Sequence, residues 1–77
     1  MPTILRIGPY RFYFYSHEPN EPAHVHVDRD GATCKMWLTP VALASSLGFK
    51  AGELRDIERL LNANRAILLE AWEAFHG

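Results

Sequence analysis

The chain has 77 residues, a formal net charge of −1 and one cysteine, which predicts a single domain, residues 1–77, with a small core. A net charge this close to zero gives no global attraction to nucleic acid or anionic membranes, and one cysteine excludes an internal disulfide framework. No stretch is apolar for the length that spans a bilayer, and we find no signal peptide. We therefore expect a cytoplasmic protein that does not contact membranes.

Two strands are predicted near the N-terminus. Weak alternation from Thr3 to Ile7 indicates the first strand, and Gly8-Pro9 ends it. The aromatic stretch from Tyr10 to Ser16 alternates with period two and indicates the second strand. Proline is unusual at the second central position of a tight hairpin turn, so a turn of more than two residues remains an alternative.

The next two strands form a hairpin. After a loop with two prolines, His24 to Arg29 predicts one strand and Ala32 to Leu38 the other, joined by Asp30-Gly31. With those two residues at the centre of the turn, His24 faces Trp37 and His26 faces Lys35.

This register gives the sheet two different faces. The predicted apolar face carries Phe12, Phe14, Val25, Val27, Cys34, Met36 and Leu38. The opposite face, which we expect to be solvated, carries Tyr13, Tyr15, His17, His24, His26, Asp28, Thr33, Lys35 and Trp37.

The C-terminal half predicts a helix. Residues Val41 to Phe49 fit either a short strand or a helical turn closed by Gly48. From Ala51 onward, apolar residues recur every three or four positions, which predicts one long amphipathic helix. A kink near Asn62 to Asn64 is an alternative to a straight helix. The expected fold is α+β: a small antiparallel sheet of about four strands with one long C-terminal helix on its apolar face.

Three histidines on one face suggest a metal site as one alternative. His24 and His26 are two apart on a strand and point the same way, and His17 lies across the loop. Together they could bind zinc with a position left for water. The other interpretation is that these histidines hydrogen-bond to neighbouring groups and that the protein has no cofactor.

A second alternative is chemistry on RNA. His24 and His26 could act as general base and general acid, and Lys35 could stabilise the added phosphate charge, which would make a metal-independent ribonuclease. The expected binding residues are Arg6, Arg11, Tyr13, Tyr15, Asp28 and Trp37. Among them, the three aromatic rings would stack on unpaired bases and the two arginines would stabilise the added phosphate charge. The same residue types are also common where a protein partner binds.

The sequence His24-Val25-His26-Val27-Asp28 resembles a family of small bacterial proteins known as the domain of unknown function four-one-six-zero. The resemblance covers essentially the whole chain. It includes Pro2-Thr3-Ile4, the Phe-Tyr strand, Glu18-Pro19, Glu21-Pro22, Asp30-Gly31, Trp37, Gly48-Phe49, Glu53-Leu54 and Ile57. The family's genes often lie beside a second small domain, which implies a two-gene module similar to toxin–antitoxin pairs.

From these observations together we expect a component of such a module that binds or cleaves RNA through its His/Tyr/Trp face. The alternatives are a non-enzymatic module that binds a protein partner and a metal-binding domain. A broad aromatic face with no helix over it also predicts a homo-oligomer or a cognate small protein partner.

Overall fold

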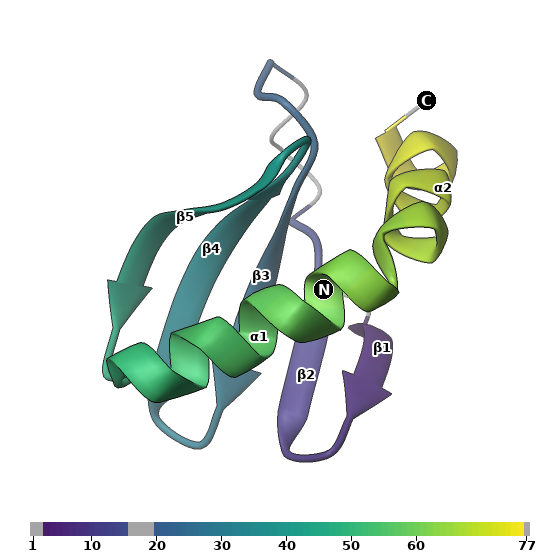
Figure 1. Ribbon diagram of the computed structural model, residues 1–77. Helices are drawn as coiled ribbons and strands as arrows, with labels where there is room; N and C mark the ends of the chain where they lie inside the picture. Colours follow the sequence, from purple (N-terminus) through teal and green to yellow (C-terminus); the bar gives the residue numbers. More distant parts are fainter. Residues whose placement is uncertain (1–2, 16–19, 77) are drawn as a thin grey trace.

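The computed structural model describes residues 3–15 and 20–76, and these form a five-stranded antiparallel sheet with two helices (Figure 1). The strand order in the sheet follows the order in the chain, so each strand pairs with its sequence neighbours. The elements are β1 (Thr3–Ile7), β2 (Tyr10–Tyr13), β3 (His24–Arg29), β4 (Ala32–Leu38), β5 (Val41–Leu47), α1 (Ala51–Ala63) and α2 (Arg65–His76). The predicted α+β class is confirmed.

The turn between β1 and β2 has only two residues, because Ile7 pairs with Tyr10. Gly8 has a φ of 56°, whereas the ring of Pro9 fixes a negative φ. A positive φ followed by a negative one is the combination of a type II′ turn, which matches the twist of a hairpin. Proline therefore fits the second central position when glycine occupies the first.

The β3–β4 hairpin has the register predicted from its turn. His24 lies opposite Trp37, His26 opposite Lys35 and Val27 opposite Cys34. Asp30 adopts a φ of 54°, a left-handed conformation that aspartate tolerates better than most residues. The turn residues thus fix which side chains share each face of the sheet.

The stretch that the sequence left ambiguous is a strand, so the sheet has five strands instead of about four. β5 pairs antiparallel with β4 and forms one edge of the sheet. Its register shifts once: Ser45 lies opposite Lys35 and Leu43 opposite Met36, which leaves Ala44 as an extra residue in a β-bulge.

The predicted long helix is broken into two at Asn64. The Asn64 side chain donates a hydrogen bond to the Leu60 carbonyl oxygen at 2.8 Å, and Arg65 Nε donates to the Leu38 carbonyl oxygen at 2.7 Å. These bonds end α1 and fix the start of α2 at the end of β4. Figure 1 shows α1 crossing one face of the sheet and α2 turning sharply from the direction of α1.

The core lies between this face of the sheet and the helices. Every residue predicted for the apolar face is buried, together with Ile57 and Leu61 of α1 and Leu68 of α2. The pattern of alternate residues therefore identified the sheet side of the core correctly. Within the described residues, neither helix has the length and hydrophobicity needed to cross a bilayer.

We expect Leu68→Ala to lower the free energy of unfolding by about 2–5 kcal/mol, because it opens a cavity in the core. The matched control is Ile67→Ala, since Ile67 is the adjacent helical residue and is 58% exposed. Chemical denaturation followed by circular dichroism measures both. Equal losses in the two variants would contradict the packing of α2 described above.

Candidate functional site

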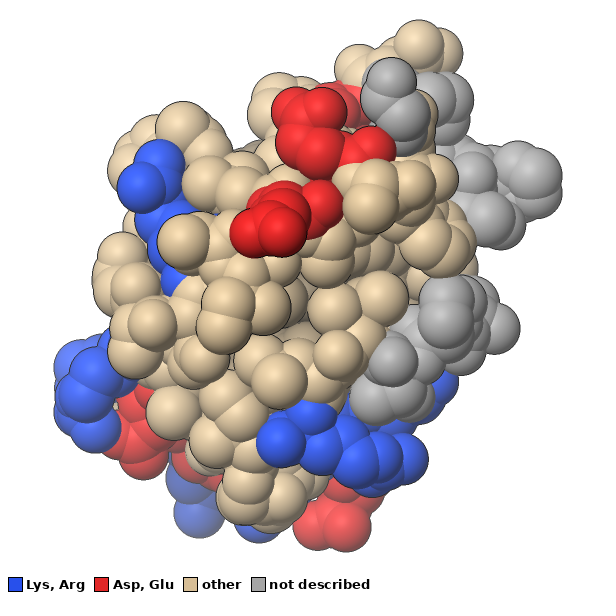
Figure 2. Space-filling model, turned by 90° about the vertical axis from the view of Figure 1, so that its right-hand side faces the viewer, with Lys and Arg blue, Asp and Glu red and all other residues tan. Residues whose placement is uncertain are grey.

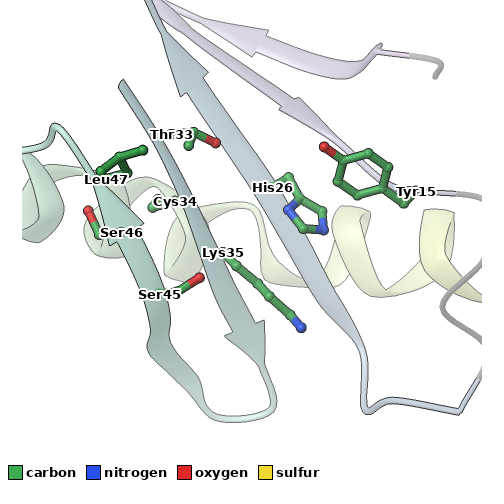
Figure 3. Close-up of a pocket in the computed structure, with 8 residues that line it drawn as sticks. All are labelled: Tyr15, His26, Thr33, Cys34, Lys35, Ser45, Ser46 and Leu47. Carbon is green, nitrogen blue, oxygen red and sulfur yellow. The ribbon is translucent and has the colours of Figure 1, made fainter. Parts of the chain in front are cut away.

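The sheet face opposite α1, called here the outer face, contains an open hollow of about 280 Å³. Its lining comes from the segment after β2 and from three strands: Tyr15, His26, Thr33, Cys34, Lys35, Ser45, Ser46 and Leu47. Figure 3 shows His26 and Lys35 side by side on neighbouring strands, with Tyr15 beyond His26 and the β5 residues on the other side of Lys35.

The ring of His26 is held by two tyrosines. Tyr13 lies opposite His26 in the register and stacks on it, with ring centroids 5.5 Å apart and an angle of 25° between the planes. Tyr15 meets the same ring edge-on at 4.3 Å and 83°. His26 is half-buried, and Tyr15 is 38% exposed. These rings gather on one face as the sequence predicted, but the expectation that Tyr13 is solvated is wrong, because only 4% of it is exposed.

Lys35 is anchored on the outer face by two neighbours. Its Nζ donates to Glu21 Oε1 and lies 4.8 Å from the centroid of the Trp37 ring. An ion pair with a carboxylate and a cation–π contact both hold the ammonium group in place. The charge of Lys35 is thus balanced by Glu21, a partner whose role the sequence analysis did not foresee.

Tyr13, Asp28 and Arg11 form a closed polar cluster. The Tyr13 hydroxyl donates to Asp28 Oδ1 at 3.0 Å, and Arg11 lies 3.7 Å from Asp28 Oδ2 and 4.6 Å from the Tyr13 ring centroid. Burial, followed by hydrogen bonds to Tyr15 and Asp28, raises the pKa of Tyr13 above its usual range. Tyr13 therefore remains a neutral hydrogen-bond donor.

Arg6 lies next to this cluster and is exposed. It is opposite Arg11 in the β1–β2 register, so both guanidinium groups belong to the same end of the outer face. Two like charges on neighbouring strands repel each other, and Asp28 offsets this repulsion through its contact with Arg11.

The expectation that His24 lies on a solvated surface is wrong, because its ring is fully buried. His24 Nδ1 donates to the Pro22 carbonyl oxygen at 2.9 Å. The ring of Trp72 covers it, with centroids 4.9 Å apart, and Trp37 flanks it at 5.6 Å. The physical reason is the break at Asn64, which turns α2 toward the end of the sheet where β3 begins.

The zinc alternative depended on His17, which lies outside the described residues. Within the parts of the chain that the structure describes, no three His, Cys, Asp or Glu side chains come together in an arrangement that could hold a metal ion. His24 and His26 do lie close together, with ring centroids 5.3 Å apart.

Several residues of this region were not predicted as site residues. Ser45, Ser46 and Leu47 line the hollow, and sequence reasoning missed them because the conformation of their segment was left open. His76 was missed as well, and its Nε2 donates to the Tyr15 carbonyl oxygen at 3.1 Å. The spacing of Trp72 and His76, one helical turn apart, was the available signal that both point the same way.

We expect the Cys34 thiol to react very slowly in the folded protein. It is buried, and burial raises its pKa from 9.0 to about 12, which lowers the thiolate fraction at neutral pH by roughly a thousandfold. Alkylation with iodoacetamide at pH 8, followed by mass spectrometry, measures this rate. The same chain in denaturant is the control, and equal rates in the two states would contradict the burial of Cys34.

Comparison with known proteins identifies the family of the chain. Residues 10–73, more than half of the sequence, match the family model described as "Domain of unknown function (DUF4160)". No curated protein and no solved structure matches the chain. The match covers β2 to most of α2, including the whole hollow and the buried histidine. The chain therefore belongs to the DUF4160 family, as its His24 to Asp28 segment indicated.

Proposed function

We propose that this protein is the RNA-binding component of a two-gene module similar to toxin–antitoxin pairs, and that it binds single-stranded RNA on the outer face. The observation that carries this proposal is the group formed by Tyr15, His26 and Lys35 at one side of the hollow. It combines an exposed aromatic ring, a titratable ring and a cation, the groups that bind unpaired bases and phosphates.

Each wall of the hollow offers a different interaction to a nucleotide. Tyr15 presents a ring on which a base can stack, and the hydroxyl groups of Thr33 and Ser45 can donate or accept hydrogen bonds. Lys35 can contact a phosphate if it exchanges part of its interaction with Glu21.

The geometry favours binding over cleavage. The proposed cleavage mechanism needed two histidines in contact with the substrate, one as general base and one as general acid. His26 borders the hollow, whereas His24 is fully buried beneath Trp72. His24 instead supports the site from behind, since it lies against both His26 and Trp37.

Charge on the rest of the surface is consistent with this placement. Figure 2 looks onto the side of the molecule where α2 lies and shows a group of acidic side chains in its upper part, basic side chains along the left and lower margins with acidic ones beside the lower group, and uncharged surface in the centre. The exposed residues Glu70 and Glu73 make α2 unfavourable for a polyanion. The exposed Arg6 belongs to the outer face instead.

We expect Tyr15→Ala to weaken binding of a short single-stranded RNA by about 1–3 kcal/mol, the contribution of one stacked base. Phe75→Ala is the matched control, because Phe75 is 37% exposed, close to the 38% of Tyr15, but lies on α2. Fluorescence anisotropy at several salt concentrations measures the affinity.

The same titrations decide between binding and cleavage. We expect the RNA to be recovered intact after incubation with the protein. RNA cleavage that disappears in His26→Ala would overturn the binding-only proposal, and equal affinities for Tyr15→Ala and Phe75→Ala would place the RNA site elsewhere.

A growth experiment tests the two-gene module. We expect expression of the protein alone to arrest bacterial growth, and co-expression of the neighbouring gene to relieve the arrest. His26→Ala combined with Tyr15→Ala should abolish the arrest while the variant still accumulates as folded protein. A harmless wild-type protein that binds the neighbouring gene product tightly would instead support the role of a non-enzymatic protein-interaction module.

A further inference from the structure

One edge of the sheet lacks most of the features that prevent strands of different molecules from pairing. β5 is an edge strand of seven residues and contains no charged residue and no proline. Leu47 is 71% exposed and Leu43 is 45% exposed. Along an edge strand, alternate backbone N–H and C=O groups point away from the sheet and can pair with another strand.

The opposite edge is different. β1 has five residues, contains the exposed Arg6 and has a bulge between Thr3 and Leu5. Charged side chains and bulges both discourage pairing at an edge. The β5 edge has a bulge too, at Ala44, but the register from Ser45 to Leu47 is regular.

We propose that β5 of one molecule pairs antiparallel with β5 of a second copy about a twofold axis, so that the two sheets become continuous. In such an isologous contact, β5 of each molecule lies beside β5 of the other. A charge near the axis would therefore lie beside a like charge. An uncharged strand fits its own copy, whereas a pairing of β1 with β1 would bring Arg6 close to its counterpart.

The geometry of the outer face also supports pairing with a second copy. Leu47 pairs with Thr33, and Ser45 with Lys35, so the side chains of Leu47 and Ser45 belong to the outer face. They border the hollow on its β5 side, where the sheet ends. A second copy paired there extends the outer face beyond this border and covers the exposed leucine with its own strand.

This pairing changes the surroundings of the hollow. In one molecule the β5 side of the hollow is a sheet edge, but in the pair it is the middle of a continuous sheet with an identical hollow across the twofold axis. The two hollows then form one elongated surface suited to an extended ligand. The pairing itself depends on β5 and not on RNA binding, so either proposal can fail without the other.

The test is sedimentation velocity of the full chain over a range of concentrations. We expect the wild type to form dimers and Leu47→Lys to raise the dimer dissociation constant at least tenfold, because a lysine on an edge strand opposes pairing. Ile67→Lys is the matched control, since Ile67 is an apolar residue of α2 that is 58% exposed. It should leave the dimer unchanged.

Amide hydrogen exchange locates the contact. On dilution from dimer to monomer, alternate amides of β5 should lose protection, whereas those of β1 should not change. The proposal is overturned if the wild type remains monomeric at millimolar concentration, if Ile67→Lys dissociates the dimer and Leu47→Lys does not, or if the concentration-dependent amides lie outside β5.

Discussion

The contact of Trp72 with both Phe14 and His24 is the interaction on which the arrangement of the molecule depends. Phe14 is part of the core, and His24 lies at the start of β3 among residues of the outer face. One indole ring therefore joins the core to the end of the outer face. This contact requires α2 to leave the direction of α1, which the break at Asn64 allows.

The buried His24 supports the outer face from behind. Its Nδ1–H group is satisfied by the Pro22 carbonyl oxygen, so burial of this polar ring does not leave that group without a partner. The ring then fills the space between Trp37, Trp72 and His26. Packing behind His26 limits the positions that its ring can take, and this preorganises the side of the hollow.

Much of the sheet was predictable because local chemistry determined it. Asp30-Gly31 fixed the register of β3 and β4, and strict alternation then assigned Val25, Val27 and Met36 to the core. The position of His26 beside Lys35 followed from the same register, whereas Tyr13 meets His26 through the pairing of β2 with β3. These features depend on residues close in sequence, for which turn chemistry and period-two alternation are reliable guides.

The remaining features depended on contacts between distant parts of the chain. The sequence from Val41 to Leu47 alternates weakly, and only pairing with β4 makes it a strand. The break at Asn64 is stabilised in part by the bond from Arg65 to Leu38, 27 residues away. The burial of His24 follows from that break. Because the sequence predicted one unbroken helix, it also placed His24, a catalytic candidate, on the solvated face.

The strand order has a consequence for how the chain folds. Because every strand pairs with its neighbour in sequence, the sheet can assemble one hairpin at a time, and each closure costs little loop entropy. The β3–β4 hairpin has a two-residue turn and a register without shifts over six residue pairs, so we expect it to form early. The contacts of Trp72 with Phe14 and His24 join parts of the chain that are far apart in sequence, so we expect them to form late. The end of the outer face is therefore completed only when the C-terminal helix docks.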